Sequence, residues 1–188
     1  MPKFDQLILH TERLLLRPLC ATDAAGMFRL RADEKVMQYG ASPPWTSMEQ
    51  ADTMIARDMK AMEEGTYLRL GLVRPEDDVL IGGCTLFHLD EQCRRAEIGY
   101  ELLPDMWGQG YMREALAALL EFGFTEMSLN RVEADVDPRN APSANILVRL
   151  GFKHEGLLKE RWIVNGEKAD TAFYGLLCAE WQAATGRA

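Results

Sequence analysis

The sequence predicts a mixed α/β fold: a mixed sheet of about seven strands, helices on both faces, and an opening between two parallel strands. Three strand-like runs, at residues 68–73, 79–88 and 95–102, are separated only by polar turns, which predicts an antiparallel meander. A helical pattern and a further strand-like run at 131–137 follow. A strand–helix–strand unit with a short crossover implies a right-handed, parallel pair.

The N-terminal part of the chain predicts one strand and two helices. Residues 11–19 alternate between inward and outward positions, as in a strand, and a helix is expected to follow as far as about residue 32. Ser47, with Gln50 three positions later, forms a capping box, which predicts a helix over residues 48–63. The apolar residues of this helix, expected to pack in the core, are Met54, Ile55, Met59 and Met62.

Residues 95–127 organise the rest of the chain as strand, glycine turn and helix. Glu97 and Glu101 share one face of the strand, while apolar side chains occupy the other face. Gly108 and Gly110 then allow a tight turn with an exposed backbone. The helix is expected to bury one stripe, formed by Met112, Ala115, Leu116, Leu119, Leu120 and Gly123.

The C-terminal part predicts one more helix and two more strands. The helix is expected over about residues 141–150. The strands, 152–164 and 168–178, flank the dipeptide Asn165–Gly166, which is a strong signal for a hairpin turn.

Length and composition indicate one domain over residues 11–180, with terminal extensions at 1–10 and 181–188. A net charge of −8 argues against nucleic acid and anionic membranes as partners, and is compatible with a cationic acceptor. Four scattered cysteines and three scattered histidines predict free thiols and no metal. Neither a signal peptide nor a membrane-spanning run is visible, so we expect a cytoplasmic protein. The sequence leaves open whether it is a monomer or a homodimer.

The glycine turn before the helix predicts a site for an anion. A helix N-terminus offers unpaired N–H groups, and the neighbouring glycines let a phosphate or pyrophosphate approach the backbone. Two nucleotide motifs do not fit: the chain has no Lys-Ser or Lys-Thr pair for a P-loop, and Arg113 stands where a dinucleotide fingerprint needs its third glycine. A strand-to-helix turn without any ligand is the alternative.

The stretch Trp107-Gly-Gln-Gly-Tyr-Met112 resembles the coenzyme A loop of the GNAT acetyltransferases, [QR]-x-x-G-x-[GA], although both of its ends depart from that motif. The W-G-x-G-Y form, and the phrase T-E-R-L-x-L-R-P-L at residues 11–19, are similar to the RimJ/RimL-like branch, which acetylates protein N-terminal amines and other amines. This resemblance implies a GNAT-like sheet with a V-shaped opening. It also implies that the pyrophosphate of acetyl-CoA lies on the amides of Gly108, Gln109, Gly110, Tyr111, Met112 and Arg113.

The resemblance also assigns roles in holding the cofactor. The string from Asn140 to Phe152 is similar to the family's N-x-x-[SA]…L-G-F signature, in which the asparagine contacts the pantetheine arm; a helix cap is the alternative role. The backbone from Tyr100 to Leu102 is expected to pair with pantetheine and to polarise the thioester carbonyl. The tyrosine that serves many family members as general acid is replaced here by Leu147.

Acetyl transfer to an amine needs a neutral nucleophile and assistance for the departing thiolate. Glu97, beside the expected thioester, is the candidate base, and Glu101 is its competitor. The alternative is that both carboxylates simply line a solvated face of the sheet and have no role in catalysis. Ser143 is the candidate donor to the sulfur, or simply a helix-start residue. Tyr39 and Trp45 are candidate contacts for the acceptor, although Trp45 can equally serve to hold its loop in place.

The sequence therefore predicts an N-acetyltransferase that uses acetyl-CoA, holds no metal, and acts on a primary amine of a protein N-terminus or a small molecule. A non-catalytic acyl-CoA-binding sensor or interaction protein is the second interpretation, left open by Leu147 and by the unusual ends of the loop. A nucleotide-binding module is a third interpretation, disfavoured by the missing nucleotide motifs.

Overall fold

The computed structural model describes residues 3–164 and 166–186. In this part of the chain, eight strands form one mixed sheet in the order β1-β2-β3-β4-β5-β6-β8-β7. The strands are β1 (Leu9–His10), β2 (Leu15–Arg17), β3 (Leu68–Arg74), β4 (Val79–Asp90), β5 (Arg95–Leu102), β6 (Arg131–Val136), β7 (Lys153–Val164) and β8 (Glu167–Leu177). The α-helices are α1 (Ala24–Ala32), α2 (Glu34–Met37), α3 (Met48–Glu63), α4 (Tyr111–Thr125), α5 (Ala141–Arg149) and α6 (Cys178–Thr185).

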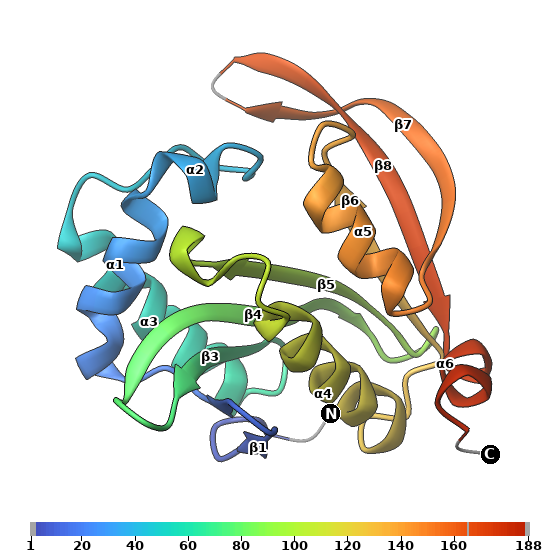
Figure 1. Cartoon of the computed structure of the whole chain (residues 1–188), viewed down its shortest axis with the longest axis horizontal. Coiled ribbons are helices and arrows are strands. Elements are labelled where there is room, and N and C mark those ends of the chain that lie inside the picture. Colours follow the sequence, from blue (N-terminus) through green and yellow to red (C-terminus); the bar gives the residue numbers. More distant parts are fainter. Residues whose placement is uncertain (1–2, 165, 187–188) are drawn as a thin grey trace.

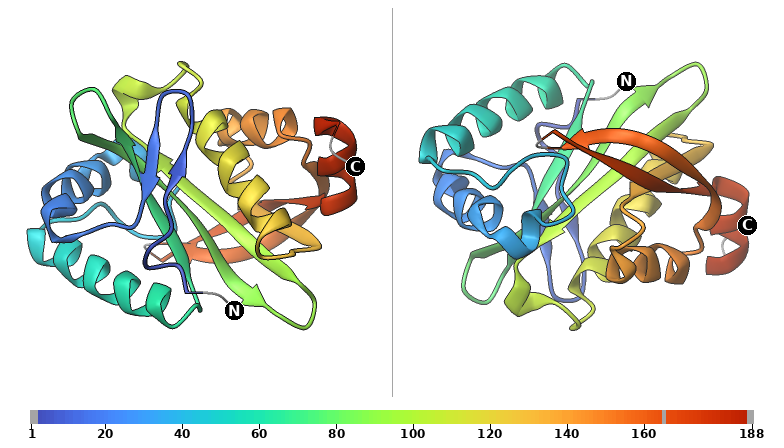
Figure 2. Two further views of the ribbon diagram at one scale, coloured as in Figure 1. Left: turned by 90° about the horizontal axis from the view of Figure 1, so that it is seen from below. Right: turned by 90° about the horizontal axis from the view of Figure 1, so that it is seen from above.

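Helices cover both faces of the sheet, which confirms the predicted fold class. In Figures 1 and 2, α1 and α3 lie on one side of the sheet, and α4 and α5 lie on the other. The protein has one hydrophobic core on each side of the sheet, and β3 contributes side chains to both. Leu70 and Leu72 pack with α4, whereas Val73 packs with α1 and α3. We call the side covered by α1 and α3 the acceptor face, because the candidate acceptor contact Trp45 packs there against Arg31 of α1.

The sheet has one strand more than the seven or so expected, because part of the N-terminal segment pairs with it. Leu9 lies opposite Leu16, which makes β1 a short edge strand. Phe4 is fully buried, and its amide donates to the carbonyl of Met62 at 2.9 Å. A two-residue strand has too few positions to show an alternating pattern, so periodicity did not reveal it.

The two parallel strands, β5 and β6, separate after a short stretch of pairing. Their register joins Arg95 with Arg131, Ala96 with Val132, and Glu97 with Glu133. Beyond this last pair β5 runs on beside β4, while β6 follows β8. The two strands thus diverge in Figure 1, and the predicted V-shaped opening begins at Glu97.

The helices bury the stripes that the sequence predicts, with one exception. All six predicted positions of α4 are buried. In α3 the prediction was wrong for Met59, whose side chain is 49% exposed, because Asp58 and Met62 take the inward positions around it. Pairing of β7 with β8 gives the expected hairpin, although Asn165 of its turn lies outside the described residues. Among the helices described, none is long and apolar enough to cross a membrane.

Candidate active site

The glycine turn opens directly onto the N-terminus of α4. Gly108 and Gly110 both have positive φ angles, +72° and +84°, which explains why glycine occupies them. A Cβ atom on Gly108 would meet nothing within 4 Å, so the turn exposes its backbone. The N–H groups of Tyr111, Met112 and Arg113, in the first turn of α4, have no intrahelical acceptor. This arrangement fits a pyrophosphate.

The N-terminal segment at residues 11–19 contacts both the glycine turn and the first turn of α4. The Thr11 hydroxyl donates to Glu114 at 2.6 Å, and the Arg13 guanidinium contacts the other oxygen of the same carboxylate at 2.7 Å. Arg13 also donates to the carbonyl of Gln109 at 3.0 Å and stacks over the ring of Tyr111 at 4.3 Å. Sequence reasoning identified the phrase and the loop separately, but not this contact between them.

The two departures from the loop motif have structural roles. Trp107 donates its indole N–H to the carbonyl of Leu102 at 2.8 Å, which closes the turn onto the end of β5. Met112 is buried in the core beneath α4. The candidate Leu102 therefore uses its carbonyl within the protein, and the side-chain amide of Gln109 is likewise used, as a donor to the carbonyl of Asp105.

Glu97 lies at the start of the V-shaped opening, on the acceptor face. Its side chain is 15% exposed, and Oε1 is 3.0 Å from Nδ1 of His88. His88 reaches it because the β4–β5 register shifts between Phe87 and Asp90 and His88 takes a positive φ of 49°. His88 was not among the candidate site residues, and no local sequence signal indicated this contact.

Glu101, the competing candidate base, is held by two arginines. Arg31 of α1 donates to both of its oxygens, at 3.0 and 2.8 Å, and Arg69 of β3 donates to Oε1 at 3.0 Å. Because arginine N–H groups donate to both oxygens of Glu101, this carboxylate is already engaged by partners within the protein. The geometry therefore favours Glu97 over Glu101 as the base.

Tyr100 and Ser143 meet across the opening on the α4 and α5 side. The Tyr100 hydroxyl and Ser143 Oγ are 2.7 Å apart. Burial raises the pKa of Tyr100, the bond to Ser143 lowers it by less, and the pKa is about 12. Asn140 caps α5 by accepting from the Ser143 amide at 3.2 Å, while Leu147 is fully buried. A tyrosine hydroxyl is thus present near Ser143, supplied by β5 instead of α5.

The two candidate acceptor residues each pack against a different arginine. The Trp45 ring packs 5.2 Å from the guanidinium carbon of Arg31, and the Trp45 amide donates to the Arg31 carbonyl at 2.9 Å. Tyr39 lies 5.8 Å from the guanidinium carbon of Arg139, which is itself paired with Asp137. The structure thus places Trp45 beside the Arg31–Glu101 pair and Tyr39 beside the Arg139–Asp137 pair.

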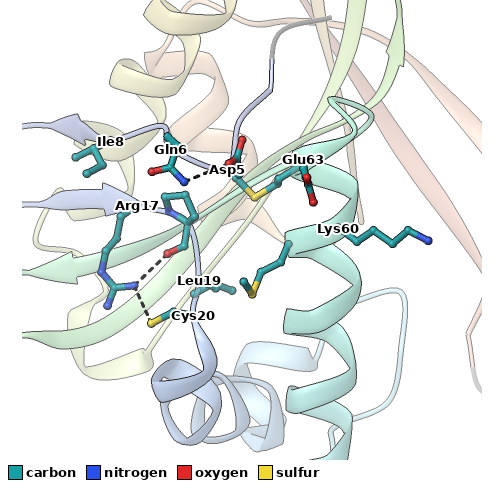
Figure 3. Close-up of a pocket in the computed structure, with 11 residues that line it drawn as sticks. Asp5, Gln6, Ile8, Arg17, Leu19, Cys20, Lys60 and Glu63 are labelled. Carbon is teal, nitrogen blue, oxygen red and sulfur yellow. Dashed lines mark hydrogen bonds between the residues drawn. The ribbon is translucent and has the colours of Figure 1, made fainter.

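A cavity of about 550 Å³ lies elsewhere. Figure 3 shows it between the strands of the N-terminal segment and α3, where Arg17, Lys60 and Glu63 are among its lining residues. It contains none of the candidate catalytic or cofactor residues. In the described part of the chain, no group of three His, Cys, Asp or Glu side chains is placed to hold a metal ion.

Comparison with known proteins agrees with this geometry. Residues 13–153 match the family model described as an acetyltransferase (GNAT) domain. The chain is 38% identical over 173 residues to the protein named uncharacterized N-acetyltransferase p20 of Bacillus licheniformis, which covers 92% of this chain and 97% of that one. It is 28% identical over 182 residues to the ribosomal protein uS5-alanine N-acetyltransferase of Escherichia coli K12, covering 92% of each.

A solved structure shows the same likeness. Mycobacterium smegmatis RimJ, in complex with CoA-disulfide, superposes with a TM-score of 0.85 at 25% identity and covers 100% of this chain and 98% of its own. The loop around Gly110 and the N-terminal phrase had predicted such relatives. The chain therefore belongs to the GNAT family of acetyltransferases, and it is an N-acetyltransferase similar to the RimJ-like enzymes.

Proposed function

We propose that this protein transfers the acetyl group of acetyl-CoA to a primary amine, that of a protein N-terminus or of a small molecule. The observation that carries the proposal is the position of Glu97 where β5 and β6 part, with the glycine turn beyond the other end of β5. A thioester lying along the parted strand would have a carboxylate on one side and the Tyr100–Ser143 pair on the other.

The chain's own groups fit the cosubstrate. The N–H groups between Gly108 and Arg113 point from an exposed turn and a helix N-terminus, which suits a pyrophosphate. Near Tyr100, β5 no longer pairs with β6. The main-chain N–H and C=O groups on this edge of β5 can therefore form hydrogen bonds with the amides of the pantetheine arm. The side-chain NH₂ of Asn140 is a further donor, because only its oxygen is used in capping α5. Acetyl-CoA, when bound, supplies the activated acetyl group.

Glu97 accepts the proton that the attacking amine must lose. Glu97 is hydrogen-bonded to His88, and His88 offers a route for that proton to solvent because its side chain is 67% exposed. As the nitrogen–carbon bond forms, the carbon–sulfur bond breaks and a thiolate leaves. The amine proton stays on Glu97 or passes to His88.

In this proposal Ser143 donates a hydrogen bond to the departing thiolate, which stabilises its negative charge, and the thiolate then takes its proton from solvent. When the Tyr100 hydroxyl donates to Ser143 Oγ, the serine hydrogen is free to point at the sulfur. Tyr100 keeps its proton at neutral pH because its pKa is about 12. The pair therefore takes the place of the family's tyrosine, whose position is occupied by the apolar Leu147.

The test is release of free CoA from acetyl-CoA in the presence of a panel of amines, with the acetylated product identified by mass spectrometry. The panel contains N-terminal peptides, polyamines, amino acids and aminoglycosides. Amine-dependent release supports the proposal. Tight binding of acetyl-CoA, with no release for any amine, would instead favour the acyl-CoA sensor.

A further inference from the structure

A second cavity, of about 480 Å³, lies on the acceptor face between the end of α1 and the first half of α3. Arg31, Trp45 and Arg57 are among its lining residues. We propose that it binds an acidic side chain of the acceptor, so that the preferred substrates are acidic N-terminal peptides. This inference rests on the proposed function, because it names the class of amine that is acetylated.

An alternating series of five charged side chains begins and ends at this cavity. Arg31 contacts Glu101 at 2.8 Å, and Glu101 contacts Arg69 at 3.0 Å. Arg69 contacts Asp58 at 2.7 Å, and Asp58 contacts Arg57 at 2.7 Å. The series holds three cations and two anions, which leaves an excess of one positive charge. Both terminal cations, Arg31 and Arg57, line the cavity.

The middle of the series is buried. The side chains of Arg69 and Asp58 are 8% and 3% exposed. Burial lowers the pKa of Arg69, but the charges of Glu101, Tyr67 and Asp58 raise it, and the pKa ends above its ordinary value. The two ends of the series, Arg31 and Arg57, are the members that line the cavity, so a ligand there meets positive charge.

The terminal arginines retain donors for a ligand. Among the described residues, Arg31 donates to Glu101 through Nε, and Arg57 donates to Asp58 through Nε and Nη2. A carboxylate placed between them would accept from the remaining N–H groups and close the series into a neutral ring of alternating charges. Such charge-assisted hydrogen bonds are stronger than neutral ones.

Other lining residues modulate this site. The ring of Trp45 lies against the Arg31 guanidinium, which limits the orientations that this terminal arginine can adopt. Glu49 also lines the cavity and opposes an anion. The lining therefore carries two positive charges and one negative charge, and removal of Glu49 should strengthen anion binding.

The position of the cavity relative to Glu97 determines the length of the ligand. Glu97 and Glu101 lie on the same face of β5 four residues apart, a separation of about 13 Å at roughly 3.3 Å per residue. An amine at Glu97 and an anion beyond Glu101 are therefore too far apart for one amino acid. An extended peptide covers this distance in about four residues, which places the acidic side chain near the third to fifth position.

The experiment compares peptides that begin with alanine and carry one Glu, at each position from the second to the sixth, with matched Gln peptides. Calorimetry measures the dissociation constant of each, so the result does not depend on turnover. The wild-type protein should bind the best Glu peptide about three- to tenfold more tightly than its Gln partner, a range that allows for the partial exposure of Arg57. CoA release is measured in parallel.

Two variants and one control separate a site from general charge attraction. Arg57→Gln should abolish the preference for Glu, and Glu49→Gln should increase it. Lys60→Gln is the matched control. This substitution also removes one positive charge from α3, but Lys60 lines the cavity of Figure 3 instead. Arg57 and Lys60 are 65% and 76% exposed, so neither substitution should unfold the chain.

Equal affinity for Glu and Gln peptides, or an equal effect of Arg57→Gln and Lys60→Gln, would overturn the subsite. A Glu preference that Arg57→Gln removes, with no CoA released from any peptide or small amine, would support the subsite and contradict the proposed acetyl transfer. The two failures are therefore distinguishable.

Discussion

Arg13 and Glu114, 101 residues apart in the sequence, form a two-point contact in which the backbone N–H and the side-chain Nε of Arg13 donate to the two oxygens of Glu114 at 2.8 and 2.7 Å. The contact joins the N-terminal segment to the first turn of α4, directly behind the glycine turn. Through its bond to Gln109, the same arginine fixes the backbone that we assign to the pyrophosphate.

Removing this support should weaken binding of the cofactor. Arg13→Gln is expected to raise the dissociation constant of acetyl-CoA about three- to tenfold, because the loss of roughly one charge-assisted bond lets the turn move. Calorimetry checks the prediction. Lys3→Gln removes a charge from the same segment without contacting the turn, and it should leave the affinity unchanged. If both variants behave alike, the contact has no role in binding.

The Glu114 carboxyl should also make stability depend on pH. Burial raises its pKa, but bonds from Thr11 and Arg13 lower it, and the pKa lies below its ordinary value. A carboxyl whose pKa is lowered on folding contributes stability that is present above the unfolded pKa, about 4.3, and is lost as pH falls through the folded pKa. Denaturant unfolding should therefore show wild type and Glu114→Gln differing near neutral pH and converging under acid conditions.

Gly110→Val should impair binding of acetyl-CoA. A β-branched residue is strained at a φ of +84°, and its side chain would crowd Arg13, 3.4 Å from the Cβ position. Gly151→Val is the matched control, because Gly151 also has a positive φ, +96°, but lies at the end of α5. Both variants should lower the melting temperature, and only Gly110→Val should lower the affinity. Unchanged affinity in Gly110→Val would exclude this turn as the site.

The Tyr100–Ser143 pair should affect the chemical step. Ser143→Ala is expected to lower kcat about 10- to 100-fold, at or below the lower end of the range for loss of one hydrogen-bond donor to a developing negative charge, and Tyr100→Phe should have a smaller effect. The KM for acetyl-CoA should change little. Because the pKa of Tyr100 is about 12, no loss of activity from its ionisation is expected below about pH 10. An unchanged kcat in both variants would remove the pair from the mechanism.

Local periodicity was sufficient to predict much of this fold. The stripe of α4 follows a 3.6-residue repeat, and the parallel pair follows from the order strand, helix, strand. Met59 shows the limit of this reasoning, because an apolar residue beside the stripe does not reveal that Asp58 points inward to Arg69. Charge pairs between distant elements have no local signature.

The candidate site was predictable to a similar degree. Glu97 and the glycine turn follow from one short stretch and from its resemblance to a family. His88 could not be assigned, because it reaches Glu97 only through a β-bulge in β4. The bonds of Arg31 to Glu101 and of Arg13 to Glu114 span about 70 and 100 residues, so they emerge only when the whole chain is folded.

The most direct test of the account is the rate of CoA release by wild type and Glu97→Gln, measured with one accepted amine from about pH 6 to about pH 9. If Glu97 is the base, kcat should fall about 10²–10⁴-fold near neutral pH, and the deficit should shrink as pH rises and more amine is already neutral. Affinity for acetyl-CoA should stay nearly constant. A raised KM with an intact kcat would mean that Glu97 only attracts the cationic amine. A wild-type kcat at every pH would contradict the central claim.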